Sequence, residues 1–236
     1  MRVLVIADIH ANRAALEALP EADAIVCAGD IVGLGPDCGA VIDALKARRA
    51  ACVRGDEDDA IAKDASRPMP PGLEHACEEL RAKTRESLSD AQMRWLRELP
   101  PELELSFDGV RIGVTHAYPG DYTRYIKPTE DEISRIGRAF PHCDVVVVGH
   151  THRQGSWRGR CLIVNPGSVG APSQAGFASY AILEGGKVTF ARARYDPNKV
   201  LEALLRAGIS EEAYRECAQE LTAGSSRPYD RLVHAR

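Results

Sequence analysis

Residues that can bind a transition-metal ion follow the strand-like segments of the chain between residues 8 and 152. Each comes directly after a short run rich in Val, Ile and Ala, such as VLVIA at 3–7 or VVVVG at 145–149. In an open α/β sheet, ligands bind beyond the carboxyl ends of the strands, so side chains that are distant in sequence can converge there. The candidate ligands are Asp8, His10, Asp30, Asp56, His116, His150 and His152.

Imidazole and carboxylate together suit Zn, Mn, Fe, Co or Ni better than Ca, which prefers an all-oxygen shell. Seven such residues could serve two ions if one carboxylate bridges them. Residues two apart on an extended chain point the same way, so Asp8 with His10, and His150 with His152, are each expected to address one side. The other histidines lie outside this pattern and are interpreted as structural: His75, His142 and His234.

The apolar runs that precede these residues predict buried strands that alternate with helices. Runs bounded by Gly, Asp and His are typical of buried strands, and helical patterns at 13–19 and 40–50 separate the first three runs. Such alternation is typical of layered α/β folds. The expected strands lie at residues 3–7, 24–28, 51–53, 111–115, 145–148 and 161–164.

The stretch from about 60 to 101 interrupts this alternation and is predicted to be a helical insertion in one domain that spans 1–236. It holds the Pro-rich segment RPMPPG (67–72), followed by two helices. Ser89 with Gln92 fits a capping box at the start of the second helix.

The later part of the domain is predicted to contain a helix, a hairpin and C-terminal helices. A capping box of Thr129 and Glu132 opens the first helix. The segment 179–195 reads as a hairpin that turns at Gly185-Gly186. Helices follow at about 196–224, and the tail 225–236 is expected to be loosely held.

Composition argues against several classes of protein. The formal net charge of -4 gives no bulk attraction for nucleic acid, so no nucleic-acid docking surface is expected. Seven scattered cysteines without C-x-x-C spacing argue against a disulfide framework or a thiolate zinc site. No segment approaches a membrane span, and the N-terminal apolar run is too short for a signal peptide. These features predict a soluble cytoplasmic protein and leave its oligomeric state open.

The order of these residues resembles the calcineurin-like metallophosphoesterase superfamily. Similarity to its small bacterial phosphodiesterase branch adds DIHAN (8–12), GDIVGLGPD (29–37) and NPGSVGAP (165–172), so the resemblance covers most of the chain. The family's D-x-H, G-D, G-N-x-[DH], H and G-H-x-H blocks correspond, in order, to Asp8–His10, Gly29–Asp30, Gly55–Asp58, His116 and Gly149–His152.

The resemblance implies an α/β fold, an αββα four-layer sandwich of two mixed β-sheets flanked by helices, with a dinuclear metal site at one sheet edge. It implies two transition-metal ions, of Mn, Fe, Zn or Ni, bridged by Asp30. One ion would be held by Asp8, His10, Asp30 and His152. The other would be held by Asp30, Asp56, His116 and His150.

The implied activity is hydrolysis of small phosphodiesters, ahead of phosphomonoesters, by attack of a metal-bound hydroxide. Metal binding makes this nucleophile available because it lowers the pKa of bound water to roughly 7. The expected partner is therefore a small phosphoester substrate.

The acidic run 56–59 departs from the family pattern at two positions. Asp56 stands where the family usually has Asn; its extra negative charge is expected to tighten cation binding and to reduce Lewis acidity. Glu57 stands where a catalytic His is common. It is either a protonated acid for the leaving group or a bystander turned away, and the bystander interpretation is favoured. Asp58 is expected to orient a ligand or its loop, and Asp59 to be a solvated residue at a helix start.

The sequence indicates the residues that contact a substrate less clearly than it indicates the candidate metal ligands. By the resemblance, Asn12 lies near the phosphate. Tyr118 and Tyr125, in the loop 117–128, could stack on a ring of the substrate, although packing or loop anchoring is the commoner fate of such side chains.

Two alternatives to a phosphodiesterase stay open. One is a binding or scaffold module that keeps the fold with little or no activity. Asp56 and Glu57 leave this alternative open because they depart from the family pattern. The other is a protein phosphatase, although the Arg and His expected around its third motif are not matched as a set. The lack of G-x-x-x-x-G-K argues against a P-loop triphosphatase.

Overall fold

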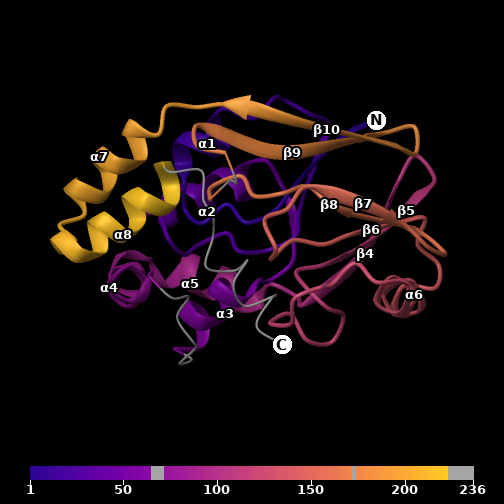
Figure 1. The fold of residues 1–236 in the computed structure, drawn as a ribbon, viewed down its shortest axis with the longest axis horizontal. Helices are drawn as coiled ribbons and strands as arrows, with labels where there is room; N and C mark the ends of the chain where they lie inside the picture. The colour runs from indigo at the N-terminus through magenta and orange to yellow at the C-terminus, as the bar shows by residue number, and fades with distance from the viewer. Residues whose placement is uncertain (65–71, 172–173, 223–236) are drawn as a thin grey trace.

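The computed structural model describes residues 1–64, 72–171 and 174–222, which form two five-stranded sheets with helices outside them (Figure 1). The first sheet holds β1 (Arg2–Ile6), β2 (Ala24–Cys27), β3 (Ala51–Cys52), β9 (Phe177–Glu184) and β10 (Lys187–Arg194), in the order β10-β9-β1-β2-β3. The second sheet holds β4 (Glu102–Phe107), β5 (Val110–Thr115), β6 (Val145–Val147), β7 (Gly155–Arg158) and β8 (Leu162–Asn165), in the order β4-β5-β6-β8-β7.

Both sheets are mixed, and the strands that precede the candidate ligands run parallel within each sheet. In the first sheet β1 pairs with β2, and β2 with β3, in parallel, whereas β9 pairs antiparallel to β1. In the second sheet β5 and β6 are parallel neighbours. Parallel strands end at a common edge, so the segments that follow β1, β2 and β3, and those that follow β5 and β6, emerge together.

The central strands are almost entirely apolar because both of their faces are buried. In β1, Val3 and Val5 face the second sheet and join the core between the sheets. Leu4 and Ile6 point the other way, into a core shared with α1 and α2. This two-residue alternation explains why a run without any polar residue forms a strand and not a helix.

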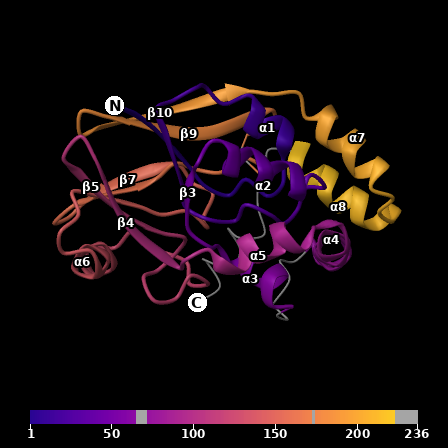
Figure 2. The same ribbon diagram turned by 180° about the vertical axis from the view of Figure 1, so that it is seen from behind.

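The helices complete the outer layers. They are α1 (Arg13–Glu17), α2 (Cys38–Ala47), α3 (Asp56–Lys63), α4 (Glu74–Ser87), α5 (Asp90–Glu98), α6 (Glu130–Ala139), α7 (Asn198–Arg206) and α8 (Glu211–Thr222). In Figure 1, α6 lies beside the second sheet at one end of the molecule, whereas α4, α7 and α8 gather at the other end. Seen from behind, α1 and α2 lie outside the first sheet (Figure 2). The expected sandwich of two mixed sheets flanked by helices is confirmed.

Most predicted elements are present, and the differences have physical reasons. All six apolar runs contain strands, and the hairpin turns at Gly185 and Gly186, which both have positive φ. Two strands, β4 and β7, were not predicted, because they are edge strands that alternate polar and apolar residues instead of forming apolar runs. The two helices predicted after the Pro-rich segment are α4 and α5, and the acidic run before that segment begins α3.

Of the two predicted capping boxes, one is complete and the other is partial. Ser89 and Gln92 form the full reciprocal box at α5. Thr129 caps α6, but the Glu132 carboxylate accepts the Lys127 N–H instead of closing the box. The tail 225–236 and nearly all of the Pro-rich segment 67–72 lie outside the described residues. Among the residues that are described, no helix is both long and apolar enough to cross a membrane.

Candidate metal centre

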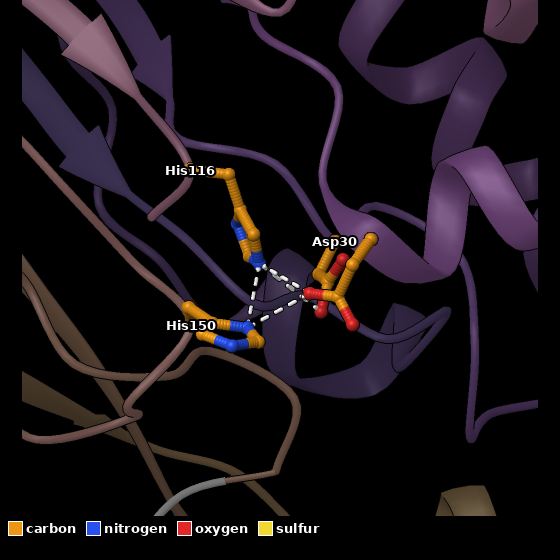
Figure 3. Close-up of side chains that lie close together, drawn as sticks. Asp30, His116 and His150 are labelled. Carbon is orange, nitrogen blue, oxygen red and sulfur yellow. Dashed lines mark hydrogen bonds and ion pairs between the residues drawn. The ribbon is translucent and has the colours of Figure 1, made fainter. Parts of the chain in front are cut away.

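The seven candidate ligands converge at one edge of the sandwich as two adjacent groups. Within each group, one potential ligand atom per residue lies within 4.8 Å of all the others. No member is more than 9% exposed. We call Asp8, His10 and His152 the first group, and Asp30, Asp56, His116 and His150 the second group. Figure 3 shows Asp30, His116 and His150 of the second group pointing toward one another.

The backbone at these residues is unusual, because most of them adopt a left-handed conformation. The φ angles are +54° at Asp8, +47° at His10, +52° at Asp30, +66° at His150 and +58° at His152. Asp and His tolerate this region better than bulky residues do, but each instance still costs of order 1 kcal/mol or more. Strained backbone of this kind tends to cluster at functional sites.

This conformation also corrects the spacing argument. Because the chain is not extended at these positions, the two-residue alternation of a strand does not fix where their side chains point. His150 and His152 therefore fall in different groups. The expectation that these two histidines address one side is wrong, although Asp8 and His10 do lie together. The two groups separate the residues as the resemblance implied, except that Asp30 falls only in the second group; its role as a ligand of both ions stays a prediction.

Glycines allow the loops to approach closely. A Cβ atom on Gly55 would lie 2.2 Å from Asp30 Oδ1 and 2.3 Å from the Asp30 nitrogen. A Cβ atom on Gly170 would lie 1.7 Å from the Ile9 carbonyl oxygen. No larger residue fits at either position without moving the backbone that carries a candidate ligand.

Asp30 lies between the two groups. Its Oδ2 is 3.5 Å from His116 Nε2 and 3.8 Å from His10 Nε2. Its Oδ1 accepts the Glu57 backbone N–H at 2.9 Å. Burial, and then the negative charge of Asp56, raise the pKa of Asp30 well above its usual value. A carboxylate in this setting is stabilised by a nearby cation.

The second group is organised around the Asp56 carboxylate. Its Oδ1 lies 2.8 Å from both His116 Nε2 and His150 Nδ1, and these two nitrogens are 3.2 Å apart. Burial would raise the pKa of Asp56, but the charges and hydrogen bonds of His150 and His116 hold it well below its usual value. His116 Nδ1 donates to the Ala28 carbonyl oxygen at 2.7 Å, which leaves Nε2 directed into the group.

The first group brings two imidazole nitrogens close together. His10 Nε2 and His152 Nε2 are 3.0 Å apart, and His152 Nδ1 lies 3.1 Å from the Ala171 carbonyl oxygen. Asp8 Oδ1 accepts the His150 N–H at 3.0 Å, whereas the buried Asp8 Oδ2 has no hydrogen-bond partner among the described residues. Burial raises the pKa of Asp8 to about 6. An orphaned buried oxygen beside converging imidazoles fits a bound transition-metal ion.

The inner acids of the run 56–59 have separate partners. Glu57 forms a two-point ion pair with Arg81 of α4, at 3.0 Å from Nε and 2.6 Å from Nη2. Asp58 is fully buried and accepts three backbone N–H groups, those of Ile31, Val32 and Gly55, at 2.9–3.0 Å. Asp58 thus joins the loop after Asp30 to the start of α3.

Asp59 is not solvated, contrary to the sequence-based expectation. It is 8% exposed and accepts the Tyr122 hydroxyl at 2.6 Å. It also pairs with Arg54 at 3.0 Å and Lys63 at 2.8 Å. The sequence argument treated a charged first turn as surface, whereas here the loop that follows β5 covers it.

The three expected substrate contacts have different surroundings. Asn12 is fully buried and caps α1 through the Ala15 N–H, and its amide donates to the Gly170 carbonyl oxygen at 2.9 Å. These contacts give it a structural role, and contact with a phosphate stays a prediction. Tyr118 packs in the core beside α6, with the Arg124 guanidinium 4.1 Å from its ring centroid. Tyr125 instead lies against His150, with ring centroids 4.2 Å apart.

Arg81 is a site residue that the sequence reasoning missed. A signal was available, because Arg81 falls on the buried face of α4 with Cys77, Leu80 and Thr84 at helical spacing. A buried Arg requires a charged or strongly polar partner. This spacing was the signal for an ion pair that the sequence analysis did not use, although it would not have identified the partner Glu57.

A family model identifies the class of protein to which this chain belongs. The domain model of the calcineurin-like phosphoesterase superfamily matches residues 1–187, and the chain belongs to that family of hydrolases acting on phosphoric esters. A metallophosphoesterase of known structure from Sphaerobacter thermophilus is similar, with 26% identity and a TM-score of 0.73 over 95% of this chain and 100% of that one.

Two further proteins are similar over most of their length. The hypothetical protein PH1004 from Pyrococcus horikoshii shares the fold, with 22% identity and a TM-score of 0.78 over 95% of this chain and 99% of that one. The uncharacterized protein MJ0912 from Methanocaldococcus jannaschii is 25% identical, over 89% of this chain and 94% of its own length.

Proposed function

We propose that the protein hydrolyses small phosphodiesters at a dinuclear transition-metal centre formed by the two groups. The observation that carries this proposal is the position of Asp30, whose Oδ2 faces His10 of the first group and His116 of the second. A carboxylate placed between two sets of imidazoles is suited to bridge two cations. The mixed donors favour Mn, Fe, Zn or Ni over Ca.

Each ion would take its ligands from one group and share Asp30. Asp8, His10, Asp30 and His152 would hold one ion, and Asp30, Asp56, His116 and His150 the other. Two such ions, when bound, supply Lewis acidity for the phosphoryl oxygens and a coordinated water of lowered pKa. They would also place positive charge in a protein whose net charge is -4, which supports the attraction of a phosphate.

The chain's own residues would orient this centre and contact the substrate. Asp58 holds the loop that carries Asp30 through the Ile31 and Val32 N–H groups. Tyr125, half-buried and stacked on His150, is the better placed of the two tyrosines to contact a substrate ring. Both Glu57 oxygens accept hydrogen bonds from Arg81, which supports the bystander interpretation over a proton-donating role.

The test is metal analysis followed by assays of an aryl phosphodiester and an aryl phosphomonoester with Mn, Fe, Ni, Zn or Mg added. We expect two ions per chain and faster turnover of the diester. Two ions without turnover of either substrate would favour the scaffold. Faster turnover of the monoester would overturn the substrate class but not the metal centre.

The role of Glu57 has its own test. We expect Glu57→Gln to lose less than about threefold in kcat, which is under 1 kcal/mol of transition-state stabilisation. A much larger loss of kcat, concentrated on the alkaline side of the pH profile, would support the general-acid role instead.

A further inference from the structure

The Glu57–Arg81 pair lies against the candidate metal centre. The Glu57 backbone N–H donates to Asp30 Oδ1 at 2.9 Å. On the side of the first group, Gly33 lies between Glu57 and His10: a Cβ atom on Gly33 would lie 2.8 Å from His10 Nδ1 and 3.4 Å from Glu57 Cγ. Glu57 therefore adjoins both groups without belonging to either.

An extra carboxylate at this position creates an electrostatic problem. Asp8, Asp30 and Asp56 already bring three carboxylates to the two groups. A fourth, if left without a counter-charge, would repel an anionic phosphate and would compete with it for the ions. A buried charge without a partner also carries a large desolvation cost.

Arg81 supplies the counter-charge from a separate helix. Arg81 is 4% exposed, and its guanidinium binds both Glu57 oxygens. Burial by itself would lower the pKa of Arg81, but the hydrogen bonds and charge of Glu57, with a contribution from Asp56, raise it. Glu57 and Asp56 therefore both stabilise the charged form of Arg81.

The helix that carries Arg81 is well anchored. Leu80, the preceding residue, packs with Val200 and Leu204 of α7 and Cys217 of α8. Helix α4 also contacts α8 directly. Arg81 is therefore presented to Glu57 from a packed helical layer rather than from a mobile surface chain.

We propose that Arg81 is a positioning residue that neutralises Glu57 and holds its carboxylate away from the ions, so that the site retains its affinity for phosphate. This inference rests on the proposed function. It assigns a role in the chemistry to helix α4, which contributes no residue to either group.

The experiment measures inhibition of the metal-loaded enzyme by inorganic phosphate. For Arg81→Met we expect the Ki for phosphate to rise by at least about tenfold, because Glu57 then presents an unpaired negative charge. Glu57→Gln removes that charge and leaves Arg81, so its Ki is expected to fall. The double variant Arg81→Met/Glu57→Gln is expected to return to within about threefold of the parent enzyme.

The control is Arg85→Met, one turn along the same helix, where the guanidinium pairs with the exposed Asp64 and binds α3 carbonyl groups. Its phosphate Ki is expected to be unchanged. Metal content is measured for every variant.

A purely structural pair would lower the melting temperature of Arg81→Met and leave its phosphate Ki unchanged, and that result would overturn the inference. If Arg81→Met does not fold, Glu57→Gln alone decides, since an unchanged Ki there also contradicts the proposal. Either result, obtained while the parent enzyme binds two ions and hydrolyses a phosphoester, leaves the proposed function intact.

Discussion

The two groups of the candidate metal centre are built in different ways. All three residues of the first group, Asp8, His10 and His152, have positive φ. In the second group Asp56 is the first residue of α3 and His116 directly follows β5, and both have ordinary backbone conformations. The first group is therefore built entirely from residues with left-handed backbone, whereas the second combines two such residues, Asp30 and His150, with Asp56 and His116 on ordinary backbone.

This difference determines which substitutions each group is sensitive to. The loop of the first group is pressed against Gly170 and Gly35, where a Cβ atom would lie 1.7 Å from Ile9 O and 2.5 Å from His10 O. The second group depends instead on the Asp56 carboxylate between two imidazoles. Added bulk at Gly170 should therefore damage the first group, whereas altered charge at Asp56 should damage the second.

The largest loss of activity and bound metal is expected at Asp30, because its carboxylate faces both groups. Asp30→Ala removes the shared carboxylate and the acceptor of the Glu57 N–H. We expect activity to fall by at least about 100-fold and bound metal to fall at both positions. Metal analysis with the diester assay checks this, with Asp131→Ala on the exposed face of α6 as the control. Loss of only one ion would show that Asp30 serves a single group.

Gly170→Ala is expected to damage the first group selectively. The new methyl group must displace the Ile9 backbone, next to His10, at a cost of about 1–3 kcal/mol in the free energy of unfolding. We expect about one ion per chain instead of two. Gly137→Ala in α6 is the matched control, because its nearest contact is an ordinary 3.4 Å. Equal loss of both ions would contradict separate construction of the groups.

The strands that precede the candidate ligands, and their order along the chain, were predictable because these strands are buried on both faces. Segments such as 145–148 must then be apolar throughout, and a following His is conspicuous. The division of the ligands was not predictable from spacing. The backbone is left-handed at both pairs, yet Asp8 and His10 stay together whereas His150 and His152 separate, an outcome that depends on tertiary contacts and leaves no periodic signal.

The contacts of the acidic run 56–59 also could not be predicted from the sequence alone. The four acids are alike in sequence, yet each has a different partner: imidazoles, Arg81, backbone N–H groups, and the set of Tyr122, Arg54 and Lys63. Except for Arg54, Lys63 and the Gly55 N–H, these partners come from segments distant in sequence. A local reading can recognise that such a run is unusual, but it cannot assign the acids to their partners.

Asp56→Asn tests the role of charge in the second group. The amide keeps an oxygen acceptor beside His116 and His150 but loses the negative charge. We expect the affinity for one of the two ions to fall by on the order of tenfold, with the first group unaffected. Metal titration of the metal-free protein checks this, with Asp56→Ala as the variant that removes the oxygen as well. If metal content, metal preference and turnover all stay unchanged, the assigned role of Asp56 is wrong.

Asp59→Asn is expected to have the smallest effect, and it tests how the loop beside the second group is held. Burial opposes ionisation of Asp59, but hydrogen bonds from Lys63 and Tyr122 and the charge of Arg54 lower its pKa. The ionised form therefore stabilises the fold above the unfolded-state pKa of about 3.9, and this stability is lost as the pH falls through the lower folded-state pKa.

Urea unfolding of the metal-free protein measures this contribution directly. At pH 7 we expect Asp59→Asn to lose about 1–2 kcal/mol relative to the parent protein, because the bonds to Arg54 and Lys63 lose their charge on one side. Near pH 3 the difference should shrink as Asp59 becomes protonated in the parent. A difference that is constant with pH would assign the loss to packing of the amide, and would leave Tyr122 as the main contact that holds the loop against α3.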